Sequence, residues 1–397
     1  MQPPLTTNNK RIESIDLLRG LIMIIMALDH SRDFFHADGL TGNPLDPATT
    51  TPILYFTRWI THFCAPTFVF LSGLSAWLQS GRKTKKELSI FLIKRGLWLI
   101  FIDLTVMTLA LTADIHFGLF LLETLWSIGA SMIVLGLMIN LPFNIILLSG
   151  LIILFGHNLL DFAEKAREFD VPVWWKLLHR VGIVPLWGNH NLFIFYPFLS
   201  WAGLTLLGYC CGSLFTNATQ QRRKKILLAI GTTAILFFVI LRAINIYGDP
   251  APWVEQKNGL QTFFSFMNVQ KYPPSLLFLC ATIGPVLIFL ALIKNTGSRL
   301  SKIVSVYGRV PLFYFIVHFT ILHIGQIITY LSRGHSVAEG MKGVPGLPFK
   351  FAMPGEGYNL LVVYGIWIAI VIIMYPLCKW YDAYKMDHKE KWWLSYL

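Results

Sequence analysis

The chain has 397 residues, of which 55% are hydrophobic and only 14% are charged, whereas charged residues make up about 25% of a soluble domain. The mean hydropathy is +0.58. These values exclude a soluble multidomain enzyme and indicate a polytopic membrane protein. The formal net charge of +12 comes from short basic clusters between apolar runs. Such clusters are typical of loops at an anionic membrane face, so we expect the lipid bilayer and no nucleic acid as a partner.

Apolar runs of about 20 residues, the length that spans a bilayer core, recur along the whole chain. They predict an all-α fold with about ten transmembrane helices in one bundle, forming a single domain over 1–397. The expected polar or interfacial parts are an N-terminal tail (1–14), a loop with a short amphipathic helix (162–191) and a basic aromatic tail (380–397). The ten expected spans are 15–35, 54–79, 88–111, 117–139, 143–161, 192–214, 225–246, 275–294, 303–331 and 358–379.

The distribution of lysine and arginine predicts the orientation of these spans. If the N-terminus is cytoplasmic, the cytoplasmic stretches hold nearly twice as many basic residues as the outer loops. The positive-inside rule then places both termini in the cytoplasm and the end of the first span on the outer side. We expect an integral membrane protein with this orientation. The five cysteines lie in apolar runs without metal-ligand spacing, so no metal is expected.

The first span ends in a cluster of ionisable residues. Asp29, Arg32 and His36 follow one another at i, i+3 and i+7, on one stripe of a continued helix, and His30 lies beside them. Ionisable groups at membrane depth are costly and usually mark a functional site. We therefore interpret this end of the helix as a candidate active site.

The second span adds Arg58 and His62 near the same depth, four residues apart on one helical face. An arginine at this depth needs a carboxylate partner, for which Asp29 or Asp33 is available. The alternative is an ion pair that only fastens two helices. The three histidines favour chemistry, because imidazole is the usual general base near neutral pH.

Later segments contribute fewer candidates. Lys271 precedes the eighth span, where it either binds an anionic substrate group or is a solvated lysine. His318 in the ninth span is expected to face the bundle core, and a hydrogen-bonded helix contact is the simpler alternative. At the inner side, Arg19 either pairs with Asp16 or meets an anionic ligand. Positively charged residues on the cytoplasmic side are the candidates for binding such a ligand, namely Arg19, Arg82, Lys83, Arg95 and Arg309.

Four stretches resemble a known family: IDLLRGLIMIIMALDHSRDFFH, TRWITHFCAPTFVFLSG, KYPPSLLFL and GRVPLFYFIVHFTILH. They are similar to the transmembrane acyltransferase superfamily, and in particular to bacterial heparan-alpha-glucosaminide N-acetyltransferase-like membrane proteins. The resemblance implies a helical bundle in the bacterial inner membrane that moves an acetyl group from acetyl-CoA across the membrane. Phe35-His36-Ala37 matches the context of the catalytic histidine in the lysosomal relatives. His30 matches the position of the key histidine in the distant acyltransferase family three.

We therefore expect a membrane acyltransferase that takes acetyl-CoA from the cytoplasm and acylates an amino or hydroxyl group of a glycan, or another acceptor, outside. Either His36 or His30 is the base or transient acyl carrier, with Asp29 orienting a histidine and Arg58 balancing charge or stabilising the oxyanion. His62, Arg32, Lys271 and His318 are the expected substrate-binding residues. The alternatives are a small-solute transporter or channel that uses the same charges as a relay, and a structural subunit. The sequence is compatible with either a monomer or a homodimer.

Overall fold

The computed structural model describes residues 12–39, 42–165, 171–293, 296–344, 347, 349–391 and 394. The protein is mostly helical, as predicted. Its longer helices are α1 (Glu13–Phe35), α3 (Cys64–Ser80), α4 (Lys85–Ile102), α6 (Thr124–Met138), α7 (Phe143–Gly156), α10 (Leu199–Asn217), α11 (Gln220–Ile244), α13 (Leu276–Leu292), α15 (Pro311–Ser332) and α17 (Leu360–Asp387). Shorter helical segments are α2 (Pro52–Trp59), η1 (Ile60–Phe63), η2 (Asp103–Met107), α5 (Thr108–Thr112), α8 (Leu159–Lys165), α9 (Val173–Leu178), α12 (Gly259–Met267), α14 (Arg299–Arg309) and α16 (Val337–Lys342).

Polar side chains fix where many of these helices begin. The side chains of Thr84, Thr219, Ser275 and Asn359 each accept a hydrogen bond from a backbone N–H in the first turn of α4, α11, α13 and α17. Such N-caps satisfy donors that have no partner within the helix. The helix bounds can also be compared with the ten expected spans. Each expected span contains a helix in the structure, although the bounds differ by several residues.

A small sheet departs from the all-α prediction. Strand β1 (Leu119–Leu122) pairs in parallel with β3 (Asn191–Ile194), which pairs antiparallel with β2 (Gly182–Pro185). Their side chains form a separate apolar cluster of Leu122, Val184 and Ile194. Two of the ranges predicted as helix, 117–139 and 192–214, thus begin in strands, because short apolar runs fit either element and their partners are distant in the sequence.

The ninth expected span, 303–331, is divided in the structure. Helix α14 ends at Arg309 and α15 begins at Pro311. Proline at the first helical position needs no N–H partner, but it cannot continue the preceding helix. The chain therefore begins a new helix at Pro311 and does not continue α14.

Five helical stretches are long and apolar enough to cross a membrane, among the residues that the structure describes. They are Pro52–Ser80, Leu199–Asn217, Gln220–Ile244, Pro311–Ser332 and Leu360–Asp387. In the most apolar windows of α11 and α17, only 22% and 17% of the residues are buried inside the protein. Lipid is the environment that can cover such apolar surfaces. The chain is an integral membrane protein.

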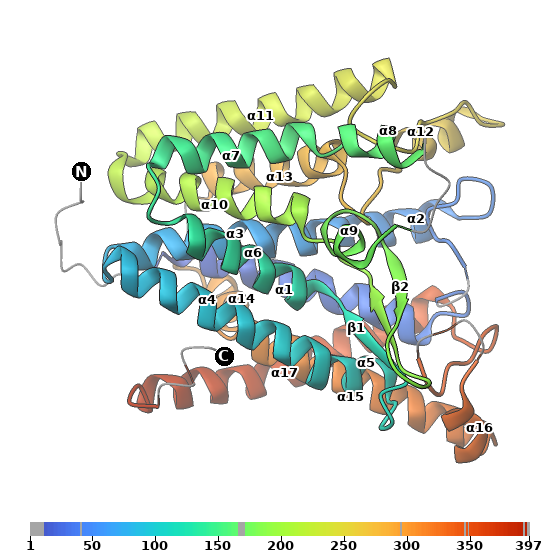
Figure 1. The fold of residues 1–397 in the computed structure, drawn as a ribbon. Helices are drawn as coiled ribbons and strands as arrows, with labels where there is room; N and C mark the ends of the chain where they lie inside the picture. Colours follow the sequence, from blue (N-terminus) through green and yellow to red (C-terminus); the bar gives the residue numbers. More distant parts are fainter. Residues whose placement is uncertain are drawn as a thin grey trace.

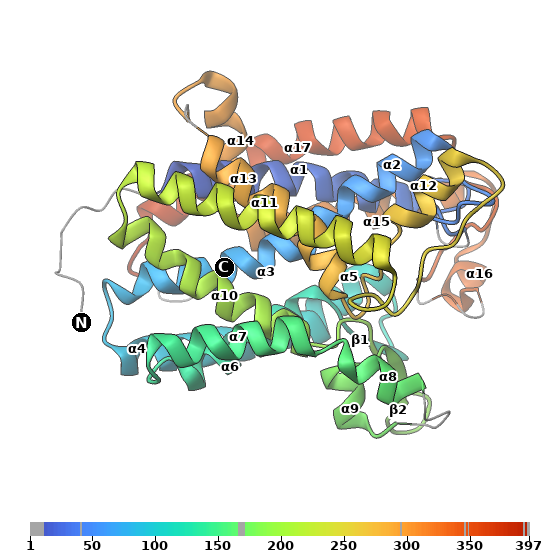
Figure 2. The same cartoon turned by 90° about the horizontal axis from the view of Figure 1, so that it is seen from above.

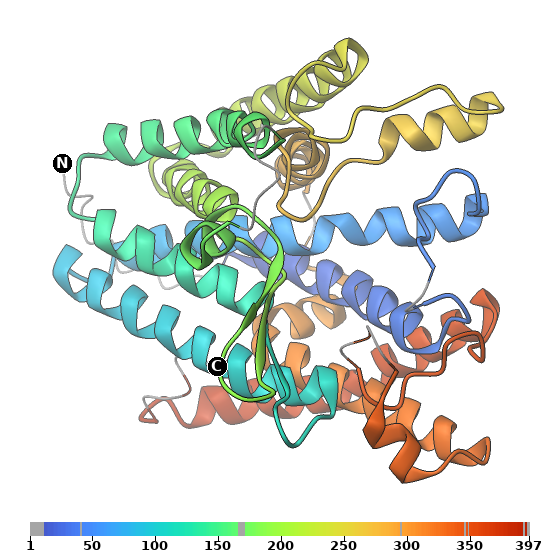
Figure 3. The same ribbon diagram turned by 45° about the vertical axis from the view of Figure 1, so that its right-hand side comes forward.

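The helices run roughly along one axis and divide the molecule into two ends (Figures 1 and 2). Helix α1 begins and α17 ends at one of them. The sheet and the short helices α8, α9, α12 and α16 gather at the other, and Figure 3 shows α12 and α16 on opposite sides of it. Helix α1 contacts α3, α14, α15 and α17, so it lies at the centre of the helices around the candidate site.

Two glycines bring α1 and α14 unusually close together. A Cβ atom on Gly308 would lie 1.9 Å from the carbonyl oxygen of Asp16, and one on Gly20 would lie 2.0 Å from that of Val304. Only glycine fits at either position. The close approach lets Arg19 donate a hydrogen bond to the Gly308 carbonyl oxygen (3.1 Å), and it brings Arg309 to the same part of the molecule.

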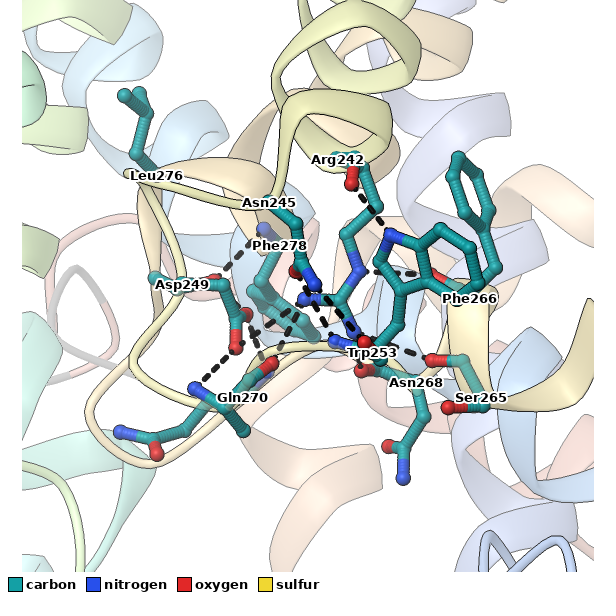
Figure 4. Close-up of polar contacts among 12 residues, drawn as sticks. Arg242, Asn245, Asp249, Trp253, Ser265, Phe266, Asn268, Gln270, Leu276 and Phe278 are labelled. Carbon is teal, nitrogen blue, oxygen red and sulfur yellow. Dashed lines mark hydrogen bonds and ion pairs between the residues drawn. The ribbon is translucent and has the colours of Figure 1, made fainter. Parts of the chain in front are cut away.

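Arg242 of α11 organises the long segment that precedes α13 (Figure 4). Its guanidinium, which is 1% exposed, donates to the carbonyl oxygens of Ala251, Ser265, Phe266 and Asn268 at 2.6–3.1 Å. The partners of Arg242 are therefore mainly carbonyl groups. One side chain therefore fixes four points of the segment between α11 and α13.

Asp249 continues this network toward the start of α13. One of its carboxylate oxygens lies 3.7 Å from Arg242 Nη1, and the other accepts from Gln270 N (2.8 Å) and Ser275 Oγ (2.7 Å). The backbone on both sides of Lys271 and Tyr272 is therefore anchored to a buried carboxylate.

We predict that Arg242→Ala destabilises the protein by about 3–5 kcal/mol, because the substitution leaves Asp249 and four carbonyl groups buried without their donor. Thermal unfolding in detergent measures the effect. The control is Arg222→Ala, which removes an exposed arginine from the other end of the same helix. Equal melting temperatures of the two variants would contradict the structural role of Arg242.

Candidate active site

A cavity of about 710 Å³ extends along α1. This volume lies within the range of about 300–1,000 Å³ that is usual for ligand pockets. Its wall follows α1 from Arg19 through Met23 and Met26 to Asp29 and Asp33, which spans about 20 Å at 1.5 Å per residue. The lining residues thus come from both ends of the molecule.

Charged residues at the end of α1 form one set of ion pairs. Arg32 Nη2 lies 2.8 Å from Asp29 Oδ1 and 2.5 Å from Asp33 Oδ1. Arg58 Nη1 lies 3.7 Å from the same oxygen of Asp29 and 2.7 Å from Thr61 Oγ1, to which it donates a hydrogen bond. The predicted pairing of Arg58 with Asp29 is confirmed. Asp29, Arg32, Asp33 and Arg58 all line the cavity.

His30 and His318 contact each other in the same region. His318 Nδ1 lies 2.7 Å from the carbonyl oxygen of Tyr314, and His318 Nε2 lies 2.7 Å from His30 Nδ1. A carbonyl oxygen can only accept, so Nδ1 of His318 carries the proton and Nε2 of the neutral ring accepts. Nδ1 of His30 is then the donor. We therefore assign to His30 the tautomer that leaves Nε2 with its lone pair.

The pair also fixes the orientation of His30. The His318 side chain is fully buried, whereas His30 is partly exposed and lines the cavity. The His30 ring lies 3.8 Å from that of Phe319, measured between centroids. A histidine that is held at Nδ1 and free at Nε2 is the usual arrangement for a general base.

Lys271 and two tyrosines extend this part of the cavity wall. Lys271 is 8% exposed, and burial, together with the nearby Arg58 cation, lowers its pKa to about 8. The hydroxyl oxygens of Tyr196 and Tyr272 lie 3.3 Å apart. We call this part of the cavity the histidine end, and its polar members are Asp29, His30, Arg32, Asp33, Arg58, Glu123, Tyr196, Lys271 and Tyr272.

Glu123 is held by a carboxylate in a distorted part of the helix that follows α4. The segment η2 is a π-helix, and Asp103 within it accepts from the backbone N–H groups of Glu123 (2.7 Å) and Trp126 (3.0 Å). A π-turn inside a helix often accompanies a functional site. Here it lets Asp103 cap the start of α6, which sets Glu123 in the cavity wall.

The opposite part of the cavity is basic, and we call it the basic end. Arg19, Arg95, Arg309 and Lys385 line it together with the neutral Ser75 and Gln79. Arg19 pairs with Asp16 (3.3 Å), one of the two alternatives that the sequence left open, and donates to Ser75 Oγ (3.1 Å). Arg309 is paired with Asp382 (2.7 Å). Between the two ends the wall is mainly apolar, and it includes Met23, Met26, Phe68, Leu71, Leu99, Ile128, Met132, Phe315 and Phe319.

Four of the residues that the sequence suggested lie elsewhere. His36 follows the end of α1 and does not line the cavity; its backbone bridges Tyr358, and its Nδ1 accepts from Asp38 N at 3.2 Å. His62 lies in the 3₁₀ turn η1 and packs against Phe278, because that turn breaks the α-helical rotation expected from Arg58. Arg82 and Lys83 are exposed and are not part of the cavity wall.

Other cavity residues were not candidates at the sequence level. Tyr196 and Lys385 carry no local signal, and Tyr272 could have been found only as the neighbour of Lys271. Glu123 stands out in the sequence as an intramembrane carboxylate, and the structure gives it a place in the wall. Nine of the thirteen candidate residues reach the cavity or, in the case of His318, contact a residue that lines it.

The fold and the site define a helical membrane protein whose internal cavity extends from a basic end to a pair of histidines. Comparison with protein families is more specific. The sequence model described as heparan-alpha-glucosaminide N-acetyltransferase, catalytic, matches residues 11–247. The chain belongs to this family, which implies an acetyltransferase, and acetyl-CoA is the donor that such enzymes use. No curated protein matches the chain.

We predict that the stability of the protein depends on the protonation of Lys271. Its pKa falls from 10.5 to about 8 on folding, so the folded state holds fewer protons than the unfolded state between these values. The free energy of unfolding should therefore rise between pH 8 and pH 10.5, by roughly 3 kcal/mol relative to Lys271→Met.

Unfolding in detergent across this pH range measures the difference between the wild type and the variant. Lys257→Met, at an exposed position of the same loop, is the control. If the free energy of unfolding changed with pH in the same way in the wild type and in Lys271→Met, the lowered pKa of Lys271 would be contradicted.

Proposed function

We propose that the protein transfers an acetyl group from acetyl-CoA, bound from the basic end of the cavity, to an acceptor at the histidine end. The observation that carries the proposal is one continuous cavity that is lined by Arg19, Arg95 and Arg309 at one end and, at the other, by His30, whose Nδ1 is held by His318. The family of the chain supports the same reaction.

The order of chemical groups along the cavity matches that of the donor. Acetyl-CoA has phosphates at one end, a long and largely uncharged arm, and a thioester at the other end. The guanidinium groups of Arg19, Arg95 and Arg309 suit phosphate oxygens, because arginine donates two hydrogen bonds in a planar fork. From Arg19 to His30, α1 rises about 16 Å. An extended arm in this stretch would bring the thioester to His30.

His30 acts as the general base in the proposed reaction. Its Nε2 takes a proton from the acceptor nitrogen or oxygen as that atom attacks the thioester carbon. The C–S bond then breaks, and the sulfur of CoA takes the proton from His30. The products are the acetylated acceptor and free CoA, and His30 returns to its initial state. His318 is a positioning residue, because it holds Nδ1 of His30.

Cationic and hydroxyl groups around His30 stabilise the transition state. Negative charge develops on the thioester oxygen during attack, and Arg58 and Lys271 are the cations that line this part of the cavity. Tyr196 and Tyr272 supply neutral O–H donors. Preorganised donors of this kind contribute about 3–4 kcal/mol each. Asp29 keeps Arg32 and Arg58 in position through the ion pairs described above.

The acceptor is an amino or hydroxyl group of a glycan on the outer side of a bacterial inner membrane. The positive-inside distribution supports a cytoplasmic basic end, where acetyl-CoA is made. The mouth at the histidine end is lined by Gly39, Gly42, Asn43, Pro44 and Leu45 of the loop after α1. Small residues and a polar amide leave room there for a sugar.

We predict that His30→Ala lowers kcat for acetyl transfer by about 10²–10⁴-fold, because the general base is lost. Radiolabelled acetyl-CoA with purified protein and a glucosamine-type acceptor provides the assay. His36→Ala is the matched control, because His36 lies off the cavity and its loss should leave kcat within a few-fold. Binding of acetyl-CoA to His30→Ala, measured by calorimetry, shows that this variant is folded.

The opposite result, an inactive His36→Ala and an active His30→Ala, would show that His36 is the general base. If both variants kept full activity, neither histidine would be the base and the proposed mechanism would be wrong.

We predict that Arg95→Ala raises KM for acetyl-CoA by about 10-fold and leaves kcat nearly unchanged, because it weakens binding of the donor equally in the ground state and the transition state. Steady-state kinetics at low and high salt measure the change, which should be smaller at high salt as screening increases. Arg82→Ala is the control, since Arg82 is exposed and lies off the cavity. An unchanged KM in Arg95→Ala would contradict a phosphate site at the basic end.

A further inference from the structure

A second cluster of titratable residues lies at the far end of α7, away from the cavity. His157 directly follows α7, Asp161 and Glu164 belong to α8, and His179 directly follows α9. Helices α8 and α9 lie next to each other at the end of the molecule that carries the sheet (Figure 2). Donor atoms of Asp161, Glu164 and His179 all lie within 4.8 Å of one another.

One nitrogen of His179 is already held by a carboxylate. Glu164 Oε1 lies 3.0 Å from His179 Nδ1, and the same oxygen accepts from Trp175 Nε1 at 2.6 Å. Nδ1 of His179 therefore donates, and its Nε2 carries the lone pair. That nitrogen lies 4.0 Å from Asp161 Oδ1. The other oxygen of Asp161 accepts from Asn158 Nδ2 at 2.6 Å.

Three imidazole nitrogens of this cluster are buried without a hydrogen-bond partner. They are Nε2 of His179 and both ring nitrogens of His157. The two residues are 1% and 3% exposed, and their ring centroids lie 5.8 Å apart. Buried polar groups nearly always have a partner, because leaving one unsatisfied costs about 1–3 kcal/mol. A neutral imidazole keeps a lone pair on one ring nitrogen, so His157 and His179 offer one each. Two unpartnered lone pairs beside a carboxylate point to a ligand that accepts lone pairs.

We propose that His179 Nε2, Asp161 Oδ1 and a ring nitrogen of His157 bind a zinc ion. Tetrahedral zinc binds histidine nitrogen and carboxylate oxygen at about 2.0–2.2 Å, which places two donors about 3.4 Å apart. His179 Nε2 and Asp161 Oδ1 lie 4.0 Å apart, so a small movement of the two side chains would bring both onto one ion. Glu164 stays outside the coordination sphere and orients His179, which is the usual carboxylate–histidine–zinc arrangement.

The surroundings supply the remaining requirements of a metal site. Asp161 lines a second cavity of about 110 Å³, together with Asn158, Tyr247 and Asp249. This cavity reaches the site on the side of Asp161, and a water molecule held there would be the fourth ligand. With Asp161 and Glu164 ionised and both histidines neutral, the charge of a zinc ion balances that of the two carboxylates.

The ion would fasten three segments that are separate in the sequence. It joins the end of α7 to α8 and to the residue after α9. Asn158, which holds Asp161, also accepts a hydrogen bond from Leu276 N at the start of α13 (2.8 Å). None of His157, Asp161, Glu164 and His179 lines the large cavity. The role of the ion is therefore structural, and it stabilises the same end of the molecule as the Arg242 network.

The metal content of the full-length protein tests this proposal. The protein is purified in detergent on an affinity tag without histidine and without chelators, and analysed by inductively coupled plasma mass spectrometry. We expect about one zinc per chain. Removing the ion with a chelator should lower the melting temperature by several degrees, and added zinc should restore it. This readout does not depend on acetyl transfer.

Variants and a spectroscopic probe test the ligands. His157→Ala and His179→Ala should each lose the zinc. His190→Ala should keep it, because His190 lies in the same region but its Nδ1 is bonded to the Phe117 carbonyl oxygen. Should the ligand variants fail to fold, cobalt(II) substituted into the wild type provides a second measurement, since a tetrahedral site gives it strong visible absorption.

Several results would overturn the proposal. A wild-type protein without stoichiometric metal, whose melting temperature does not respond to added zinc, has no such site. Zinc retained by both His157→Ala and His179→Ala would show that the ligands are wrong. A different transition metal in stoichiometric amount would overturn the assignment to zinc.

Discussion

The charge balance at the end of α1 is the constraint on which the site depends. A charged side chain at membrane depth is costly unless its charge is compensated. At the histidine end, the cavity wall holds three carboxyl groups, two arginines and one lysine. Asp29 is central, because it pairs with Arg32 on its own helix and with Arg58 on the next. Removal of any one member leaves another uncompensated. The cluster therefore fixes α1 against α2 and η1, and it holds His30 at a defined depth.

Helix α1 is restrained at both ends by different means. Near its start, Gly20 and Gly308 allow contact with α14 at backbone distance, which steers Arg19 into the basic end. Near its other end, the ion pairs and the His30–His318 contact restrain it. The opposite wall is less regular, because Lys271 and Tyr272 lie in a segment without long helices. In that segment the backbone is held by hydrogen bonds to the side chains of Arg242 and Asp249, which take the place of the hydrogen bonds of a helix. Both walls of the histidine end are therefore anchored by buried charges.

The sequence predicted features that depend on local pattern and failed where distant contacts decide. Hydropathy located a helix in each expected span, and the depth of Asp29 and Arg58 followed from their positions in adjacent spans. The break at Pro311 and the strands β1 and β3 were missed, because long apolar runs hide both. The choice between His30 and His36 could not be made, since the contact that orients His30 lies 288 residues away. The 3₁₀ turn at Ile60–Phe63 likewise has no clear sequence signal, and it separates His62 from Arg58. His157, Asp161 and Glu164 do have helical spacing, but His179 completes their cluster only in the fold.

The apolar middle of the cavity matters for a protein in a membrane. A polar path between the basic end and the histidine end would let water and protons cross whenever the donor is absent. Met23, Met26, Leu71, Leu99 and Met132 line this stretch, and an apolar lining disfavours a continuous column of water. Methionine side chains are also flexible enough to close on one another and to repack around an inserted chain. The arm of acetyl-CoA would fill this stretch, and the tautomer of His30 is set by His318 whether or not the donor is present. In the proposed reaction, the apolar stretch separates the base from the basic end, so acetyl transfer through the protein does not need a continuous polar path.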